Sequence, residues 1–351
     1  MFSIKNRNWT QKPAAVILRI AVMIFLAGLA VPIVTDFRGF GEQEVTQAAS
    51  SDRTDLQLMS VYEFTLSPDH QQILCRGNRN QIVLRDTVTG SLIDAFDFQA
   101  IHPRTIANAS TDNMFLTGYE DGSLVLWNKE KEGDQYTSNV LGRRDCMTLT
   151  CALSSDLRLA ASGYEDGIIT IWDARSGTRL KDIQAHSDNA RCVRFSTDGR
   201  RLLSASSDIC VWDVETGKVI AKLIGHNLSV RSDAFSPNGS RVVSGGVYDG
   251  TVRVWDVASA TELWQAKLDD NTMVLAVAYS PDGKIVASGS TDGDVSLWDV
   301  QTHQRLAKLK GPRHPISCLE FSADAKKLYS ASMDGTIRVW DISTGMEIQR
   351  L

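Results

Sequence analysis

Side chains of the types that form a hydrolytic triad recur in this 351-residue sequence. The three sets are His186, Ser204 and Asp208; His226, Ser244 and Asp249; and His314, Ser330 and Asp334. In an acyl-transfer enzyme such residues act as base, nucleophile and orienting carboxylate. An active site needs one nucleophile, so a set that occurs three times favours a structural use of the same hydrogen-bonding groups.

No other local motif predicts chemistry. The sequence lacks GxxxxGK[ST], HExxH and GxSxG, and it has no GxGxxG after a strand. The six cysteines have no CxxC spacing: Cys75, Cys146, Cys151, Cys192, Cys210 and Cys318. His70 and His303 have no Cys or His cluster beside them. We therefore expect no enzyme activity, no cofactor and no metal site.

Composition limits the partners. Hydrophobic residues at 43% and charged residues at 23% are typical of a globular protein. The formal charge of −5 is unevenly distributed, because residues 1–38 carry +4 and residues 39–351 carry −9. An acidic body is a poor match to a phosphate backbone, so we expect no nucleic-acid partner.

An apolar segment near the N-terminus is long enough to cross a bilayer as a helix. Residues 14–35 contain one charge, Arg19, and follow a basic segment, residues 1–13. Acidic residues come after it, so the positive-inside rule places the N-terminus in the cytoplasm and the remaining chain outside. The polar residues 36–56 are expected to form a flexible linker.

Two other interpretations of this segment stay open. The basic start and Gly28-Leu29-Ala30 also resemble a secretory signal peptide cleaved after Ala30, which would release the domain as a secreted or periplasmic protein. The apolar stretch continues to Val34, which favours an uncleaved anchor. Apart from Cys146 with Cys151, no cysteine pair suggests the disulfide that an external domain usually has, so an inverted anchor is the third reading.

Beyond the linker the sequence repeats. The repeat marker is a Trp followed by Asp or Asn, at steps of 45, 40, 43, 43 and 42 residues. The pairs are Trp127-Asn128, Trp172-Asp173, Trp212-Asp213, Trp255-Asp256, Trp298-Asp299 and Trp340-Asp341. Arg85-Asp86 marks a degenerate seventh copy. Most copies also have an Asp-Gly turn between two β-rich runs, which predicts a hairpin.

A period near 43 with a terminal Trp-Asp resembles the WD40 repeat, and the likeness covers about residues 57–351. Seven copies imply an all-β, seven-bladed propeller of four-stranded blades, preceded by one hydrophobic helix. The chain ends where the fourth strand of the last blade should end. We therefore expect residues 346–351 to complete that blade, without a strand from the weakly β-forming residues 45–52.

The resemblance also implies a hydrogen-bond network of His, Ser or Thr, Asp and Trp within a blade. By position it comprises His186, Ser204, Asp208 and Trp212; His226, Ser244, Asp249 and Trp255; and His314, Ser330, Asp334 and Trp340. Blade 2 offers His102 at a shorter spacing, and blade 3 has Arg143 at the His position. A turn carboxylate needs donors and an indole N–H needs an acceptor, which explains the residue types.

The rim formed by the loops before the first strand and between the second and third strands is where such propellers most often bind partners. Gly-Tyr-Glu-Asp-Gly occurs twice there, in blades 2 and 3. The candidate partner-binding residues are Tyr119, Glu120, Tyr164, Glu165, Tyr248 and Arg143. Exposed tyrosines beside carboxylates suit a protein interface. The competing interpretation is that these residues are copied turn residues that pack on neighbouring blades.

These observations predict a non-catalytic scaffold: a monomeric propeller tethered to a membrane that binds a protein or peptide on its rim. The alternative is a propeller enzyme or a glycan- or small-ligand-binding module that uses the central channel. That alternative requires polar residues outside the repeat pattern to converge on the axis, and none is evident in the sequence.

Overall fold

The computed structural model describes residues 46–47, 58–67, 69–77, 81–98, 101–108, 114–130, 136–269 and 272–351. The predicted basic segment 1–13, the apolar segment 14–35 and most of the predicted linker 36–56 lie outside these residues. In the part of the chain that is described, no helix is long and apolar enough to cross a membrane. One compact unit spans Val45–Leu351.

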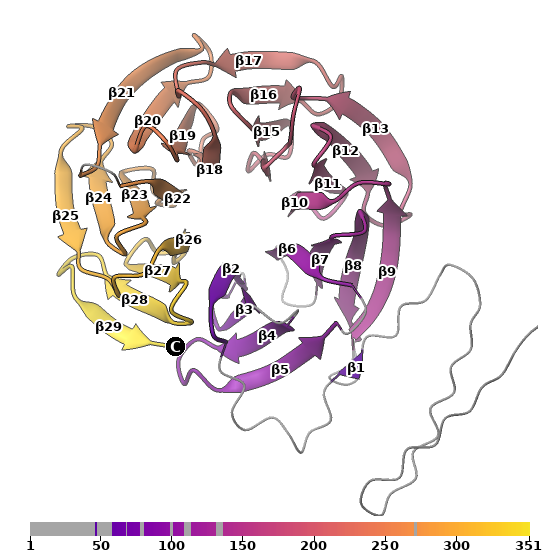
Figure 1. Ribbon diagram of the computed structural model, residues 1–351, viewed down its shortest axis with the longest axis horizontal. Coiled ribbons are helices and arrows are strands. Elements are labelled where there is room, and N and C mark those ends of the chain that lie inside the picture. Colours follow the sequence, from indigo (N-terminus) through magenta and orange to yellow (C-terminus); the bar gives the residue numbers. More distant parts are fainter. Residues whose placement is uncertain are drawn as a thin grey trace, which may run out of the picture. The chain divides into compact units, whose positions relative to one another are not determined.

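Seven antiparallel sheets surround a central axis, which confirms the predicted seven-bladed propeller (Figure 1). The innermost strands are β2 (Val61–Leu66), β6 (Pro103–Asn108), β10 (Thr148–Leu153), β14 (Cys192–Phe195), β18 (Val230–Phe235), β22 (Val274–Tyr279) and β26 (Ile316–Phe321). The second strands are β3 (Gln72–Gly77), β7 (Met114–Tyr119), β11 (Leu159–Tyr164), β15 (Arg201–Ala205), β19 (Arg241–Gly246), β23 (Ile285–Ser290) and β27 (Lys327–Ser332).

The third and fourth strands complete each blade outward. The third strands are β4 (Gln81–Asp86), β8 (Ser123–Lys129), β12 (Ile168–Asp173), β16 (Ile209–Asp213), β20 (Thr251–Asp256), β24 (Val295–Asp299) and β28 (Ile337–Asp341). The fourth strands are β5 (Leu92–Asp97), β9 (Tyr136–Arg143), β13 (Arg179–Gln184), β17 (Val219–Leu223), β21 (Thr261–Lys267), β25 (Arg305–Leu309) and β29 (Glu347–Arg350).

Burial follows the position of a strand in its blade. The second strand is buried along almost its whole length, as in β19 and β23, because both faces of the sheet pack on neighbouring blades. The fourth strand alternates between buried and exposed positions, as in β17. Apolar clusters therefore form mainly between blades, and one of them joins Phe64 of blade 1 to Tyr329 of blade 7.

The Asp of each Trp-Asp pair holds the turn between the third and fourth strands. Asp213 Oδ1 accepts hydrogen bonds from the amide and the hydroxyl of Thr216, at 2.7 and 2.6 Å. Asp86 binds Thr89 in the same way, so the degenerate first blade keeps this turn although it lacks the Trp. A carboxylate that accepts two local donors fixes a tight turn without help from other blades.

The chain closes the ring with its own C-terminal strand. β29 pairs with β28 as the fourth strand of blade 7, as predicted. The ring is joined across blades 1 and 7, where Ser317 Oγ donates to the Val61 carbonyl at 2.6 Å. The described part of residues 45–52 adds no strand to blade 7, as expected. Thr46–Gln47 forms a two-residue strand, β1, on the free edge of β5 in blade 1.

Candidate functional site

Blades 4 and 5 each contain a continuous hydrogen-bonded chain from Trp to Asp. In blade 5, Trp255 Nε1 donates to Ser244 Oγ at 2.8 Å, and Ser244 Oγ lies 2.8 Å from His226 Nε2. His226 Nδ1 lies 2.8 Å from Asp249 Oδ2. Blade 4 repeats the arrangement with the residues predicted for it, and its three distances are 2.8, 2.9 and 2.9 Å.

The proton positions in this chain follow from the types of group. The indole can only donate, so the Ser hydroxyl is free to donate to Nε2 of a neutral imidazole, whose Nδ1–H donates to the carboxylate. Burial lowers the pKa of His226, against the opposing effect of Asp249, and so favours the neutral form. Burial alone would raise the pKa of Asp249, but hydrogen bonds from His226 and Thr251 lower it.

The Ser, His and Asp side chains of these chains are placed as in a hydrolytic triad, but no substrate can reach the hydroxyl. Ser204 and Ser244 are fully buried, and each hydroxyl oxygen already accepts a Trp indole N–H. Without access to a substrate carbonyl, this geometry serves packing rather than acyl transfer.

The other blades keep only part of the chain. A Trp indole donates to a Ser or Thr hydroxyl in blades 2, 3, 6 and 7, at 2.8 to 2.9 Å. His314 does not join Ser330 and Asp334. It is exposed, and its Nδ1 lies 3.1 Å from the Pro312 carbonyl. Asp334 instead accepts hydrogen bonds from Thr336.

Tyr119 and Tyr164 are not rim residues, which corrects the prediction for blades 2 and 3. Both side chains have an exposure of 0%. The Tyr164 hydroxyl lies 2.9 Å from Ser162 Oγ, where His226 lies beside Ser244 in blade 5. These tyrosines follow the last Gly of β7 and β11, and the equivalent residue in blade 5 is Gly246.

The size of that residue decides which side chain fills the space. A Cβ on Gly246 would overlap Asp249 Oδ1 and His226 Nδ1, so a His requires a small residue there. In blades 2 and 3, where the His is turned outward or missing, a Tyr occupies the space, whereas blades 6 and 7 have Ser290 and Ser332 at this position. His102 of blade 2 is exposed and binds Glu120 only through its carbonyl, at 3.1 Å. Tyr119 and Tyr164 are therefore core residues.

Arg144, and not Arg143, takes the His place in blade 3. Its Nη2 lies 2.8 Å from Asp166 Oδ2, and its guanidinium lies 5.4 Å from the centre of the Tyr164 ring. Arg143, at the end of β9, is exposed, and its Nε donates to the Asp121 carbonyl at 3.1 Å, so this contact lies within blade 2. The residue at the His position of blade 3 is therefore one position later than predicted.

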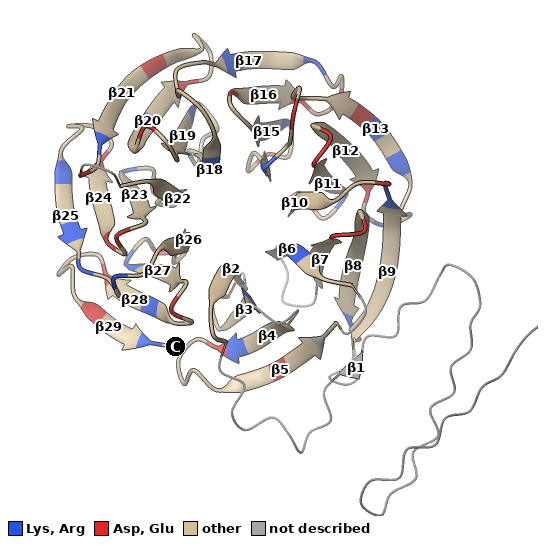
Figure 2. Cartoon of the chain, in the orientation of Figure 1, with Lys and Arg blue, Asp and Glu red and all other residues tan. Residues whose placement is uncertain are grey.

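The remaining predicted rim residues are accessible. Tyr248 is 66% exposed, Glu165 is exposed, and Glu120 is partly exposed beside Arg104, with 3.8 Å between Oε1 and Nη1. Figure 2 shows acidic residues in the turns between β7 and β8 and between β11 and β12. The rim of blades 2 and 3 is thus charged and lacks the aromatic anchors expected of it.

Exposed apolar side chains gather instead at the rim of blade 5. We define the blade 5 rim patch as Ile224, Leu228, Tyr248 and Met273, which are 74, 55, 66 and 37% exposed. Ile224 and Leu228 lie in the connection before β18, and Tyr248 lies in the turn after β19. The Val247 amide donates to the Ser229 carbonyl at 3.1 Å, which joins these two loops. Gly250, at φ +63°, packs against the carbonyl of Thr272, which brings the loop of Met273 to the same place.

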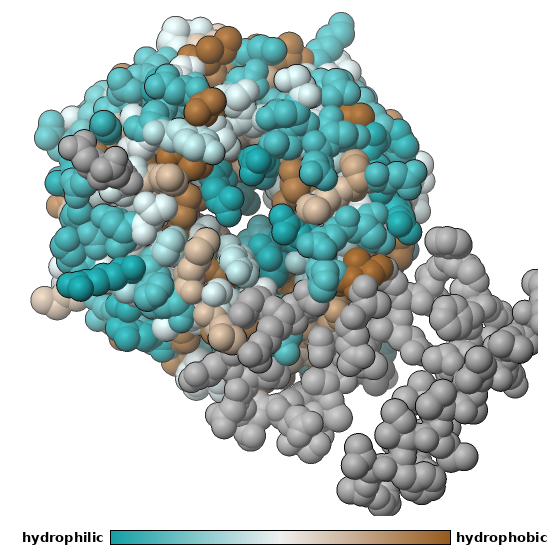
Figure 3. Space-filling model, viewed as in Figure 1, coloured by the Kyte–Doolittle hydropathy of each residue, from teal (hydrophilic) through white to brown (hydrophobic). Residues whose placement is uncertain are grey.

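A cavity of about 640 Å³ lies between the seven inner strands. We call it the central cavity, and Figure 3 shows it as a hollow bordered mostly by hydrophilic residues. Its lining includes five arginines, which are Arg76, Arg104, Arg191, Arg194 and Arg231, and two glutamates, which are Glu63 and Glu120. The expectation that no polar residues converge on the axis is therefore wrong.

A comparison between the copies would have revealed these arginines. Arg104, Arg191 and Arg231 share the same position at the start of the inner strand. Arg76 pairs with Glu63 in blade 1, and the equivalent residue is Gly or Ala in every other blade. Arginine at a position that otherwise holds Gly or Ala does not serve the repeat fold, which marks it as a candidate for a separate use.

One group of described residues could hold a metal ion by distance alone: His186, Asp208 and Cys210, with ligand atoms within 4.8 Å. Both nitrogens of His186 already bind Asp208 and Ser204. The residues therefore fit a hydrogen-bond network better than a metal site. All six cysteines are free thiols, including Cys146 and Cys151, and four of them are buried.

The four-stranded blades and the repeated indole-to-hydroxyl hydrogen bond define a WD40-type β-propeller. The chain belongs to the family described as the IFT122 first beta-propeller, whose sequence model matches residues 148–351, more than half of its length. No curated protein matches the chain.

Proposed function

We propose that this propeller is a non-catalytic scaffold that binds a protein or peptide partner through the blade 5 rim patch. The observation that carries the proposal is the concentration of four exposed apolar side chains on one set of adjoining loops. Large apolar residues on a soluble surface mark interaction sites when they form a contiguous patch, and Tyr is enriched at binding hot spots. The family and the buried Ser204 and Ser244 both favour a scaffold over an enzyme.

Charged residues nearby would orient the partner. Arg253, in the strand after the Tyr248 turn, is held by Glu262 at 2.7 Å and by Asp249 at 3.4 Å. Two carboxylates face this one guanidinium, so the apolar patch has a border with a net charge of −1 at this point. Such a surface suits an amphipathic segment of a partner more than a highly charged one.

Site-specific photocrosslinking tests this proposal. A photoreactive amino acid is placed at Tyr248, and, as a matched control, at Val88, which is 78% exposed in a turn of blade 1. We expect a discrete adduct at Tyr248 that disappears when Leu228→Glu is added, and no such adduct at Val88. Mass spectrometry of the adduct identifies the partner. Equal adducts at both positions would contradict a dedicated site.

We further propose that residues 14–35 anchor the propeller to a membrane, with the N-terminus in the cytoplasm. The support is the length and apolarity of this segment and the basic residues before it. Peptide mapping of the mature N-terminus and carbonate extraction test the proposal. An anchored protein retains residues 14–35 and stays in the membrane fraction. A chain that begins near Val31 and is released by carbonate would instead be an extracytoplasmic binder cut from its signal peptide.

A further inference from the structure

The central cavity has the opposite charge sign from the protein around it. Five arginines and two glutamates line it, whereas residues 39–351 as a whole carry −9. The Glu63 carboxylate already has hydrogen-bond and ion-pair partners. It accepts hydrogen bonds from the Ile106 amide at 3.0 Å and from Thr105 Oγ1 at 3.3 Å, and it lies 3.5 Å from Arg76 Nε. The local excess of positive charge therefore belongs to the remaining arginines.

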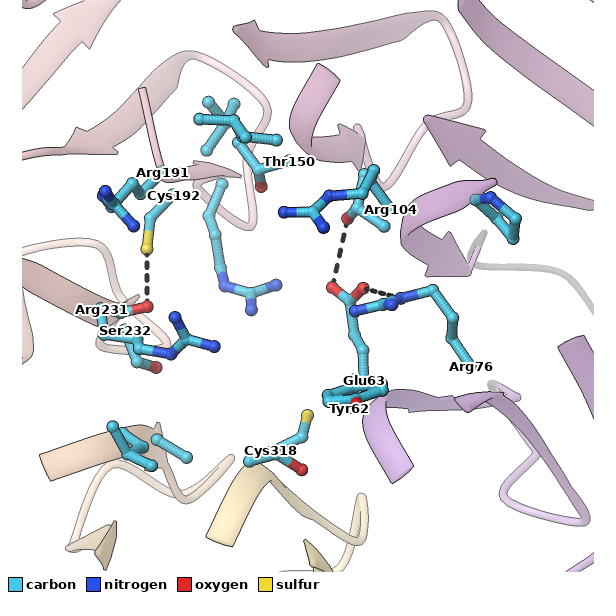
Figure 4. A pocket seen from close by; sticks show the side chains of 18 of the residues that line it. Tyr62, Glu63, Arg76, Arg104, Thr150, Arg191, Cys192, Arg231, Ser232 and Cys318 are labelled. Carbon is cyan, nitrogen blue, oxygen red and sulfur yellow. Dashed lines mark hydrogen bonds and ion pairs between the residues drawn. The ribbon is translucent and has the colours of Figure 1, made fainter. Parts of the chain in front are cut away.

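Two of these arginines have no hydrogen-bond or ion-pair partner in the part of the chain that the structure describes. Among the described residues, the guanidinium groups of Arg194 and Arg231 make no hydrogen bond or ion pair, and both side chains are accessible from the cavity. Arg104 has one exposed ion pair, with Glu120 at 3.8 Å. Figure 4 shows Arg76, Arg104 and Arg231 directed from three blades toward the middle of the cavity. Converging guanidinium groups repel one another unless an anion lies between them.

Two acidic residues near Arg194, Asp233 and Glu320, cancel only part of this charge. Asp233 is 1% exposed and neither of its carboxyl oxygens has a hydrogen-bond partner, while Glu320 accepts the Leu66 amide at 3.1 Å. Burial raises the pKa of each carboxyl group to about 7, against the opposing effect of Arg194. At pH 7 each carboxyl group is therefore about half ionised, and the two together offset only part of the positive charge of the arginines.

We propose that the central cavity binds a phosphate-bearing anion through Arg104, Arg194 and Arg231. Guanidinium groups match phosphate oxygens in geometry and form charge-assisted, often bidentate hydrogen bonds. A phosphate monoester carries nearly two negative charges at pH 7. A cavity of about 640 Å³ has room for a phosphorylated small molecule or for a phosphorylated side chain. This site is separate from the blade 5 rim patch, and the two proposals are tested independently of each other.

Calorimetric titration of the full-length chain in detergent tests the proposal. The probes are pyrophosphate, a phosphoserine peptide and the same peptide without phosphate. We expect at least one phosphate-bearing probe to bind, with an affinity that falls as salt is added, and the unphosphorylated peptide not to bind. Pyrophosphate alone would indicate a small-molecule ligand. The phosphopeptide alone would indicate a phosphorylated partner.

Variants connect the binding to the cavity. Arg194→Gln with Arg231→Gln should weaken binding by at least about ten-fold, because each lost charged hydrogen bond contributes on that scale. Arg158→Gln is the matched control, since Arg158 is a 75% exposed arginine outside the cavity. Arg231→Gln alone serves if the double variant does not fold. Unchanged binding in a folded Arg231→Gln variant, or no binding of either phosphate probe at about 10 mM, would overturn the proposal.

Discussion

In blades 4 and 5 a histidine from the loop before the inner strand fills the space beside the Trp-bound hydroxyl, whereas in blade 3 a tyrosine from the second strand fills it. The two solutions exclude each other, because the His needs Gly246 or Ser206 where blade 3 has Tyr164. The comparison shows that the tyrosine of the repeated pentapeptide Gly-Tyr-Glu-Asp-Gly can be part of the buried core. The binding residues that we propose lie where the copies differ, as at Tyr248 and Arg194.

The largest effect is expected from shortening the buried tyrosine. Tyr164→Ala should lower the free energy of unfolding by about 3–5 kcal/mol, as for other large aromatic residues in a core. Tyr248→Ala, on the exposed rim, should change it by less than about 0.5 kcal/mol. Guanidinium-induced unfolding of the two variants measures the difference. If Tyr164→Ala were as harmless as Tyr248→Ala, Tyr164 would not be a core residue.

A methyl group added at Gly246 tests the mutual exclusion. Gly246→Ala should destabilise blade 5 by about 1–3 kcal/mol through overlap with His226 and Asp249. His226→Ala removes the overlap with Nδ1 and releases Asp249 from its hydrogen bond to His226, so the Asp249 side chain can move away from the methyl group and the two changes together should cost less than the sum of the single changes. Thermal unfolding of the four proteins in this cycle gives the coupling. If the free-energy changes of the two substitutions were strictly additive, residue 246 and His226 would not compete for the same space.

The turn carboxylates should contribute different amounts to stability, depending on the groups that they bind. Asp249→Ala removes the acceptor for both His226 and Thr251, which should cost about 1–3 kcal/mol. Asp334→Ala removes the acceptor for Thr336 and no histidine, so its cost should be about 1 kcal/mol or less. The melting temperatures of the Asp249→Ala and Asp334→Ala variants, measured under the same conditions, test this difference. Equal losses of stability in the two variants would mean that His226 does not help to stabilise the turn.

The smallest effect concerns pH. His186 and His226 have pKa values lowered by burial from 6.5, so the unfolded chain binds protons more readily than the folded one. Their stabilising contribution is complete above about pH 6.5 and is lost as the pH falls below it. Replacement of both by Gln should therefore flatten the decline in melting temperature between pH 7.5 and about 5.5.

The Gln variant must be compared with the parent protein, because two other groups change the stability in the opposite direction as the pH rises. Asp233 and Glu320 have raised pKa values, so they reduce stability as the pH rises toward 7. Both proteins contain them, and the comparison between the Gln variant and the parent protein removes their effect. Parallel pH curves for the two proteins would contradict the assignment of neutral, buried imidazoles.

The fold could be predicted from the sequence because every blade carries its own local signals. The Trp-Asp pairs set the period, the Asp-Gly turns set the hairpins, and the last copy ends at a strand, β29. The positions of His186 and His226 in their blades followed from the same repeat. Each of these signals lies within one copy, and its recurrence at a fixed period identifies the repeat fold.

The site was harder to predict because it depends on packing between loops. Whether Tyr119 and Tyr164 are exposed is decided by whether a loop from the preceding blade brings in a His, and their own strands do not reveal this. The shift from Arg143 to Arg144 and the outward turn of His314 are loop conformations of the same kind. The cavity arginines left a signal in the sequence, but it is visible only when equivalent positions are compared across all seven copies.

The central claim is that the blade 5 rim patch, and not the charged rim of blades 2 and 3, binds the partner. The most direct test is the affinity of the crosslinked partner, once purified, for two paired variants. Leu228→Glu with Tyr248→Glu should weaken binding at least about 100-fold, because it places charge at two apolar contacts. Glu120→Gln with Glu165→Gln should leave it nearly unchanged. The reverse pattern would return the binding site to blades 2 and 3.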